Sequence, residues 1–328
     1  MSDLLEMMLD QTDRLFGDHV DRQLLVEVEQ GGWPSGLWAQ VEAFGLPDAL
    51  IVPAQDGGLS FAEAGALFAS LGRHVVPLPV GETMLARMML ARAGVEAPVG
   101  PIALAAGGDQ AFAAQGVGHV LVQRDGRWAL EVQSGAALGS IARVPYAVAQ
   151  GGKAIATHPI PDGLPDLLTL GAMLRASQMA GAVARVLEMA VDYANTRQQF
   201  GRPIGRFQAV QQLLARLAAE AAAGQAASDM AWSALDAGTL DHAGAIAKIR
   251  AGEAARIAAT IGHQVHGAIG VTDEHMLHYV TRRLWTWRLE YGSERAWATR
   301  LGEAARREGD LWSFLTTRCG AAALEQLA

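Results

Sequence analysis

The chain has 328 residues, of which 51% are apolar and 18% charged, with a formal net charge of −8 at pH 7. This length allows one large core or two to three domains, and the composition is that of a globular chain, not a disordered one. The negative net charge argues against a nucleic-acid partner.

The cysteine count and the N-terminal composition predict a cytoplasmic protein. Cys319 is the only cysteine, so it cannot form an internal disulfide, and we expect an incidental thiol there. Residues 1–10 carry acidic side chains and no basic region, which argues against a secretory signal peptide. No uninterrupted apolar run approaches the roughly 20 residues that a membrane span needs. We therefore expect no membrane partner.

Residues 1–98 are predicted to form an N-terminal helical domain. Ser60 is placed to cap a helix, with Glu63 three residues later as its capping-box partner. Residues 50–53 are expected to be extended, and residues 82–93 to form another short helix.

Residues 99–160 lose the helical period and are predicted to form a short antiparallel β domain. Asp125 and Gly126 lie between two β-type runs and are typical of a hairpin turn. The runs are residues 102–104, 119–122, 128–132 and 146–149.

Residues 161–328 are predicted to form a four-helix-type bundle, so that the whole chain is mainly α with a small β domain. Apolar side chains recur every three or four residues on both sides of a short turn at residues 197–204. Two helices joined by such a turn are expected to pack antiparallel. This places Arg197, Phe200 and Gln208 at one end of the bundle. Further helices are predicted for residues 240–266, 273–288 and 294–308.

Three motifs follow one another along the chain. The most specific occupies residues 193–208 and reads Tyr-Ala-Asn-Thr-Arg-Gln-Gln-Phe-Gly-Arg-Pro-Ile-Gly-Arg-Phe-Gln. Residues 264–270 read Gln-Val-His-Gly-Ala-Ile-Gly, and a weaker early set begins at Trp33-Pro34. In this order they make the chain similar to the FAD-dependent acyl-CoA dehydrogenase family. The resemblance covers nearly the whole chain, and the predicted order of helices, sheet and bundle agrees with it.

The resemblance implies an FAD site at the end of the bundle. Arg197 would pair with the pyrophosphate, Phe200 would pack against a flat or ribityl part, and Gln208 would bond the adenine edge. In the family these groups reach a flavin held mainly by a neighbouring subunit, so an oligomer is implied. The same adenine–pyrophosphate end is expected to be contacted by Gln264 and by the backbone of Gly267 and Gly270.

Four of these residues also have an ordinary structural interpretation, which for Phe200 is that of a core residue. Arg197 can be a solvated charge at a helix end, and Gly267 and Gly270 can simply terminate a helix. The histidine pairs 263/266 and 275/278 have a spacing that can ligate zinc, but no cysteine or carboxylate set completes a site. No metal is therefore predicted.

The implied reaction is α,β-dehydrogenation of an acyl-CoA thioester, with electron-transfer flavoprotein as the acceptor. A carboxylate removes the α proton while the flavin takes hydride from the β carbon. In the commonest family pattern this base is a Glu directly before Gly and Thr or Ser. Here Tyr291 precedes Gly292-Ser293, and the candidate base is Glu290. Glu290 lies about 100° away around a helix, so it serves only if the local turn differs.

Two further features separate the chain from the usual family pattern. A minority of the family places its base on the helix before the 197–204 turn, but residues 172–180 contain Arg175 and Gln178 and no acid. The β domain is also short. Family members usually place a tryptophan behind the flavin ring, and Trp128 takes that place only if it is not a core residue. Both features resemble subunits of heteromeric acyl-CoA dehydrogenases, in which two related chains share each flavin and one supplies the carboxylate.

Three hypotheses follow from the sequence. The chain is an acyl-CoA dehydrogenase active as a homo-oligomer with Glu290 as base, or a base-lacking partner subunit in a hetero-oligomer, or a flavin-free scaffold descended from the family. The sequence does not define the acyl group, whether fatty, branched or a steroid side chain.

Overall fold

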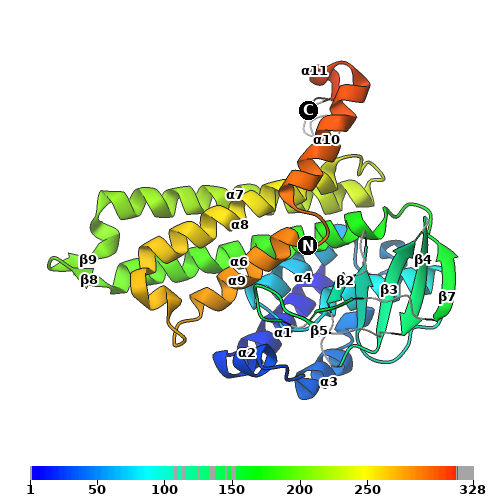
Figure 1. Ribbon diagram of the computed structural model, residues 1–328, viewed down its shortest axis with the longest axis horizontal. Coiled ribbons are helices and arrows are strands. Elements are labelled where there is room, and N and C mark those ends of the chain that lie inside the picture. Colours follow the sequence, from blue (N-terminus) through cyan, green and yellow to red (C-terminus); the bar gives the residue numbers. More distant parts are fainter. Residues whose placement is uncertain are drawn as a thin grey trace.

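The computed structural model describes residues 2–106, 110–112, 116–124, 126–132, 137–144, 146–148, 153–314 and 316. The chain forms an N-terminal group of helices, two small sheets and a long helix bundle that carries a two-stranded β-ribbon at its turn (Figure 1). The sheets lie at one end of the bundle, and the helices of the N-terminal group pack along its side. Cys319 and Asp125 lie outside the described residues.

The N-terminal helices confirm the local capping signals in the sequence. Ser60 accepts from the Glu63 N–H while the Glu63 side chain accepts from the Ser60 N–H, which is the predicted capping box. Residues 50–53 form a turn and pair with no described strand, so the predicted extended segment is wrong. The helices are α1 (Asp3–His19), α2 (Arg22–Glu29), α3 (Ser35–Phe44), α4 (Phe61–Arg73) and α5 (Val80–Arg92), with 3₁₀ turns η1 (Leu46–Asp48) and η2 (Ala54–Asp56).

The larger sheet has the strand order β1-β3-β4-β7, and a smaller one has the order β2-β6-β5. Strands β3 and β4 pair antiparallel, with Arg124 opposite Arg127, which confirms the predicted hairpin. Strand β1 runs parallel to β3, so the expectation of a purely antiparallel sheet is wrong. Between β1 and β3 the chain passes through β2, which belongs to the other sheet. This crossover lets β3 run in the same direction as β1. The strands are β1 (Ile102–Ala105), β2 (Gln110–Phe112), β3 (His119–Arg124), β4 (Arg127–Val132), β5 (Ala137–Leu138), β6 (Tyr146–Val148) and β7 (Ala154–Pro159).

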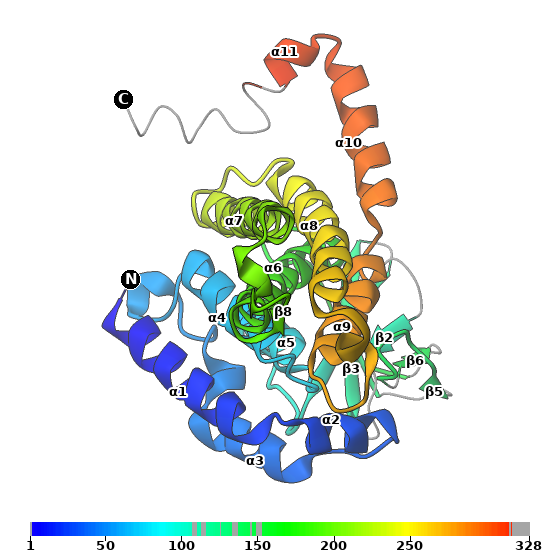
Figure 2. The ribbon, with the colours of Figure 1, turned by 90° about the vertical axis from the view of Figure 1, so that its left-hand side faces the viewer.

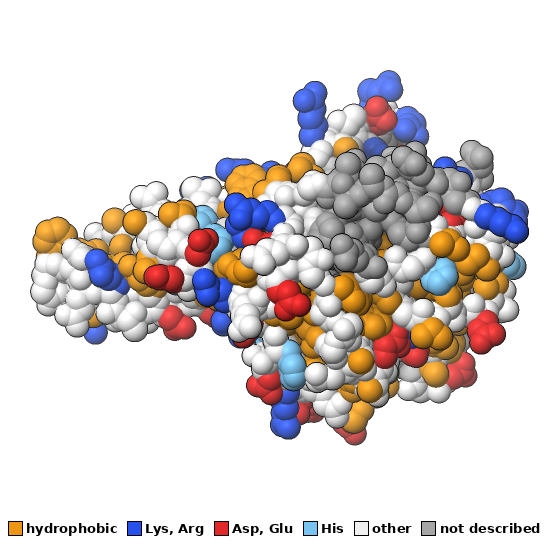
Figure 3. Space-filling model, turned by 60° about the horizontal axis from the view of Figure 1, so that its bottom comes forward, with side chains coloured by type: hydrophobic (Ala, Val, Ile, Leu, Met, Phe, Trp, Pro, Cys, Tyr) orange, Lys and Arg blue, Asp and Glu red, His pale blue; other side chains and the backbone are white. Residues whose placement is uncertain are grey.

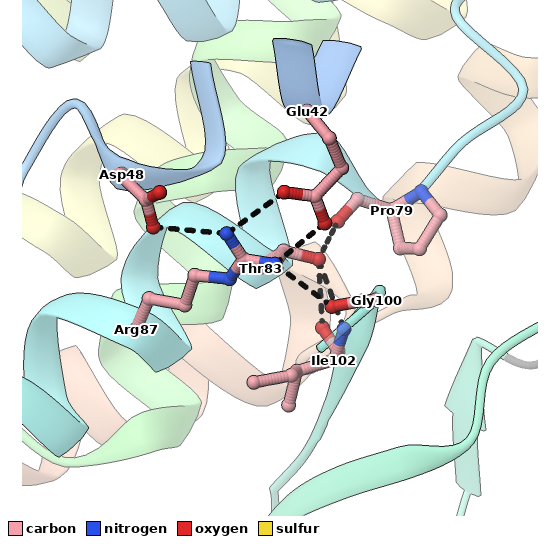
Figure 4. A network of polar contacts seen from close by, with 7 residues as sticks. All are labelled: Glu42, Asp48, Pro79, Thr83, Arg87, Gly100 and Ile102. Carbon is pink, nitrogen blue, oxygen red and sulfur yellow. Dashed lines mark hydrogen bonds and ion pairs between the residues drawn. The ribbon is translucent and has the colours of Figure 1, made fainter. Parts of the chain in front are cut away.

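A polar network around Arg87 joins the N-terminal helices to the first strand (Figure 4). Arg87 on α5 donates to Glu42 on α3, to Asp48 on η1 and to the carbonyl of Gly100. One turn earlier, the Thr83 hydroxyl accepts from the Ile102 N–H at 3.0 Å. Buried groups thus find partners on both sides of the boundary between α5 and β1.

Helices α6 (Leu167–Thr196), α7 (Gln208–Asp236) and α8 (Ala243–His266) lie side by side in the bundle (Figures 1 and 2). Helix α6 turns back into α7 through β8 (Gln198–Gln199), β9 (Arg202–Pro203) and η3 (Ile204–Arg206), as the short turn predicted. The expected helix 273–288 begins later, and α10 leaves the body of the bundle (Figure 2). The remaining elements are η4 (Gly267–Val271), α9 (Leu277–Leu289), α10 (Glu294–Glu308) and α11 (Leu311–Ser313).

Two glycines allow α4 and α6 to pack closely. A Cβ at Gly72 would lie 2.0 Å from the carbonyl oxygen of Gln178, and one at Gly181 would lie 1.8 Å from that of Ala69. Such distances exclude any larger side chain, so the N-terminal helices are fixed against the bundle core. Helix α6 is long and apolar enough to cross a membrane, but 83% of its most apolar window is buried by other parts of the protein.

Candidate functional site

The turn between α6 and α7 lies at the end of the bundle opposite the sheets (Figure 1). Arg197 ends α6: its N–H donates to Tyr193 at 2.8 Å, and its carbonyl accepts from Ile204 at 2.8 Å. Gln208 is the first residue of α7, and both side chains are exposed. Phe200 is 91% exposed at the tip of the turn. A space-filling view shows this end as a projecting arm with hydrophobic side chains on its surface (Figure 3).

A groove of about 350 Å³ lies beside this turn. Its walls bring Phe200 and Gln264 together, although they belong to separate segments of the bundle. Arg197 and Gln208 are not among the lining residues and lie next to the groove at the adjacent helix ends. The lining residues are Gln199, Phe200, Ile204, Phe207, Ala209, Val210, Leu213, Gln264 and Val265.

The two predicted glycine contacts differ in their surroundings. Gly267 ends α8 with φ +64°, and a Cβ there would meet nothing within 4 Å, so its backbone is open to a ligand. Gly270 is buried, and a Cβ there would lie 2.9 Å from Leu277 and 3.1 Å from His266. Gly270 is therefore required for packing in η4, and of the two glycines it is Gly267 that terminates α8.

Histidines gather beneath this glycine turn. The His266 ring stacks on Tyr193, with 4.6 Å between centroids, and meets His275 edge-on at 4.7 Å. His263 Nε2 lies 2.9 Å from the Thr281 hydroxyl, and burial lowers the pKa of His263 and His266. Among the described residues, no three or more His, Cys, Asp or Glu side chains are placed to hold a metal ion.

Glu290, the candidate base, lies at the other end of the bundle from the groove, in a buried ion network. Its Oε2 accepts from Arg175 Nε at 2.6 Å, and Arg175 is 2% exposed. The same guanidinium donates to Glu82 Oε1 and to Gln178 Oε1, each at 2.5 Å. Burial and the neighbouring Glu82 carboxylate raise the pKa of Glu290. Glu82 was not predicted from the sequence, although an arginine inside an apolar helix indicates that such a partner exists.

Tyr291 occupies the position where the family pattern places its base. The chain leaves the helix at Glu290, and Tyr291 has φ +51°, so the local turn is not helical. A Cβ at Gly171 would lie 2.3 Å from the Tyr291 ring, and the hydroxyl donates to Leu104 on β1 at 3.3 Å. The tyrosine therefore fills the space between α6 and the first strand.

A buried lysine holds this turn from the side of α8. Lys248 Nζ donates to the carbonyl of Arg288 at 3.0 Å and to that of Gly292 at 2.7 Å. Burial lowers the pKa of Lys248 to about 7, against the attraction of Glu294. Lys248 thus fixes the backbone on both sides of Glu290 and Tyr291.

Comparison with known proteins identifies the class. Residues 166–304 match the family model "Acyl-CoA dehydrogenase, C-terminal domain". The chain belongs to the acyl-CoA dehydrogenase family. Among its relatives is acyl-CoA dehydrogenase IpdE2 of Mycobacterium tuberculosis, which is 32% identical over 269 residues, covering 77% of this chain and 81% of the relative. Acyl-CoA dehydrogenase FadE34 of the same organism is 44% identical over 117 residues, covering 35% of this chain and 16% of that protein.

Solved structures share the fold over almost the whole chain. The steroid acyl-CoA dehydrogenase Tcur3481-Tcur3483 superposes with a TM-score of 0.79 at 24% identity, covering 94% of this chain and 99% of that one. A chain of the ChsE4-ChsE5 complex from Mycobacterium tuberculosis gives 0.75 at 21% identity, covering 93% and 98%. Helix–sheet–bundle architecture is thus common to these proteins and to this chain.

Proposed function

We propose that the chain is a partner subunit of a heteromeric FAD-dependent acyl-CoA dehydrogenase that acts on an acyl-CoA thioester. It contributes its bundle end to a flavin site shared with a related chain, and that chain supplies the catalytic carboxylate. The observation that carries this proposal is the ion pair between Glu290 and Arg175, next to a tyrosine at the base position.

The neighbourhood of Glu290 is poorly suited to proton abstraction. A base must reach its proton with a lone pair that no stronger donor holds. The guanidinium of Arg175 occupies one oxygen of Glu290 and is itself fixed by Glu82 and Gln178. Moving Glu290 toward a substrate would leave Arg175 with an incomplete set of partners in a buried setting. The alternative, a chain active alone with Glu290 as base, requires this network to open.

The bundle end fits one part of a dinucleotide. Arg197 presents exposed N–H donors that match a pyrophosphate, and Phe200 presents an aromatic face that the chain itself leaves uncovered. Gln208 and Gln264 add carboxamides that can pair with an adenine edge. When bound, the flavin supplies the hydride acceptor for the β carbon. The groove beside this turn, with the exposed Phe200 on its wall, suits a cofactor held between two protomers.

An assembly of unlike chains is supported by two structural neighbours, which are named as pairs: Tcur3481 with Tcur3483 and ChsE4 with ChsE5. We extend the proposal to electron-transfer flavoprotein as acceptor and to a cytoplasmic location. A steroid acyl group is supported by the name of one structural neighbour, a steroid acyl-CoA dehydrogenase.

The proposal is tested by expressing the chain alone and together with a longer related chain from the same cell. We expect a yellow protein with the flavin band near 450 nm (roughly, the usual position) only from the pair, and bleaching of that band by acyl-CoA. Glu290→Gln in the pair should bleach at the parental rate. A lone chain that is yellow, bleaches with acyl-CoA and loses this in Glu290→Gln would establish the single-chain alternative. A colourless pair would support the hypothesis of a flavin-free scaffold.

A further inference from the structure

Three arginines are more than nine-tenths buried in the part of the chain that the structure describes: Arg87, Arg175 and Arg283. Arg87 and Arg175 are both ion-paired, although Nε of Arg87 has no hydrogen-bond partner. Arg87 binds two carboxylates and a carbonyl, and Arg175 binds two carboxylates and a carboxamide. Arg283, which is 7% exposed, has neither a hydrogen bond nor an ion pair to any described residue.

Arg283 lies where the bundle meets the N-terminal helices and the sheets. It lies on α9 two turns before Glu290 and therefore on nearly the same face of the helix. One turn after it, Thr286 accepts from the N–H of Ala142 at 2.8 Å, so the segment around Ala142 docks beside it. The carboxylates of Glu29 at the end of α2 and of Glu82 on α5 both favour the charged form of Arg283.

The neighbouring carboxylates pair with other cations. Glu29 pairs with Arg282, and Oε1 of Glu82 pairs with Arg175, while Oε2 of Glu82 has no hydrogen-bond partner. Arg175 and Arg282 in turn oppose the charge of Arg283, and burial lowers its pKa to about 9. Arg283 is therefore a cation at neutral pH whose N–H donors meet no acceptor among the described residues, on a side chain that is only 7% exposed and where an unpaired charge is unfavourable.

Buried polar groups without partners are rare in native proteins, and an unpaired one calls for an explanation. A guanidinium presents its donors in a rigid fork that matches the two oxygens of a carboxylate. We propose that Arg283 anchors a binding site for a carboxylate group, which enters the junction of α9, α2 and α5 on a small organic acid or on a carboxylate-bearing acyl chain. Arg175 offsets the repulsion between Glu82 and such a group. The site lies within this chain and does not rest on the division of roles between subunits.

Binding of three probes tests the site, with the chain purified together with any subunit that accompanies it. Glutaryl-CoA and pentanoyl-CoA have acyl groups of the same length and differ in a terminal carboxylate against a methyl. Free glutarate presents the carboxylate without the thioester. By calorimetric titration we expect at least about tenfold tighter binding of glutaryl-CoA than of pentanoyl-CoA, since a charge-assisted bidentate contact is strong. Free glutarate that competes with glutaryl-CoA would identify a small acid as the source of the carboxylate.

Arg283→Met should remove the preference for glutaryl-CoA, whereas Arg256→Met, on an exposed face of α8, should retain it. The melting temperature separates recognition from a structural role. Removal of an unpaired buried cation should raise it, as for other residues that serve binding at the expense of stability. A fall in melting temperature together with lost preference would make Arg283 a structural residue and overturn the proposal. Equal affinity of the parent for both thioesters, or no binding of any probe, would overturn it without need of a variant.

Discussion

Arg175 Nε and Glu290 Oε2 lie 2.6 Å apart and join the first third of α6 to the end of α9. The same guanidinium reaches Glu82 on α5, so one side chain connects the N-terminal helices, the bundle core and the turn that holds the candidate base. This arrangement makes the region around Glu290 a structural junction, and several measurable consequences follow from its geometry.

Arg175→Met should destabilise the protein by about 3–5 kcal/mol, because removal of one partner leaves buried carboxyl groups without compensation. The free energy of unfolding in urea measures the effect. Arg185→Met, which removes an exposed arginine from the same helix, should change it by no more than about 1 kcal/mol. Equal stability of the two variants would mean that Glu82 and Glu290 do not depend on Arg175.

Lys248 predicts a specific pH dependence of stability. Burial lowers its folded-state pKa to about 7, from 10.5 for an ordinary lysine, so between these values the unfolded chain binds the extra proton. Stability from this group therefore rises with pH across that window, by as much as about 5 kcal/mol. Lys248→Met should lose this rise. The unfolding free energy of the parent minus that of the variant should therefore increase from pH 7 to pH 10.

The only other lysine, Lys153, is exposed and offers a matched control. Lys153→Met should follow the parental pH curve of stability. Parallel curves for the parent and Lys248→Met would show that Lys248 is solvated in the folded protein.

Gly171 and Tyr291 should be energetically coupled. Gly171→Ala places a Cβ 2.3 Å from the ring, and overpacking of this kind costs about 1–3 kcal/mol. In a Tyr291→Ala background the same change should have little effect, which a double-mutant cycle of unfolding free energies detects. Gly302→Ala meets no atom within 4 Å and should be neutral or slightly stabilising. Additive effects of the first two changes would mean that the tyrosine does not fill this space.

The bundle end should govern flavin content without affecting folding. In the proposed hetero-oligomer, Arg197→Met and Phe200→Ala should each weaken FAD binding at least about tenfold, because each removes an exposed contact group. The ratio of flavin to protein absorbance after dialysis measures retention. Arg216→Met, an exposed charge on α7, should leave the ratio unchanged. Full retention in both variants would place the cofactor elsewhere.

Local chemistry made much of the fold predictable. The Ser60–Glu63 capping box and the bounds of α10 are properties of neighbouring residues, and both agree with the structure. The direction of β1 was not predictable, because it depends on where the chain goes between β1 and β3. The partner of Glu290 was hidden for a similar reason: Arg175 is 115 residues away in sequence, and only packing of α6 against α9 brings them together. The predicted cofactor contacts stay a prediction, with Phe200 and Gln264 meeting in one groove.

Helix α6 carries both Arg175 and Arg197, 22 residues apart on one uninterrupted rod. At 1.5 Å per residue, about 33 Å of rigid backbone separates the inner junction from the exposed tip. Such a lever lets a protomer extend its far end into a neighbour while its own interior stays closed. A subunit can therefore lack its own catalytic base and still supply contacts that the active site of a neighbouring subunit requires.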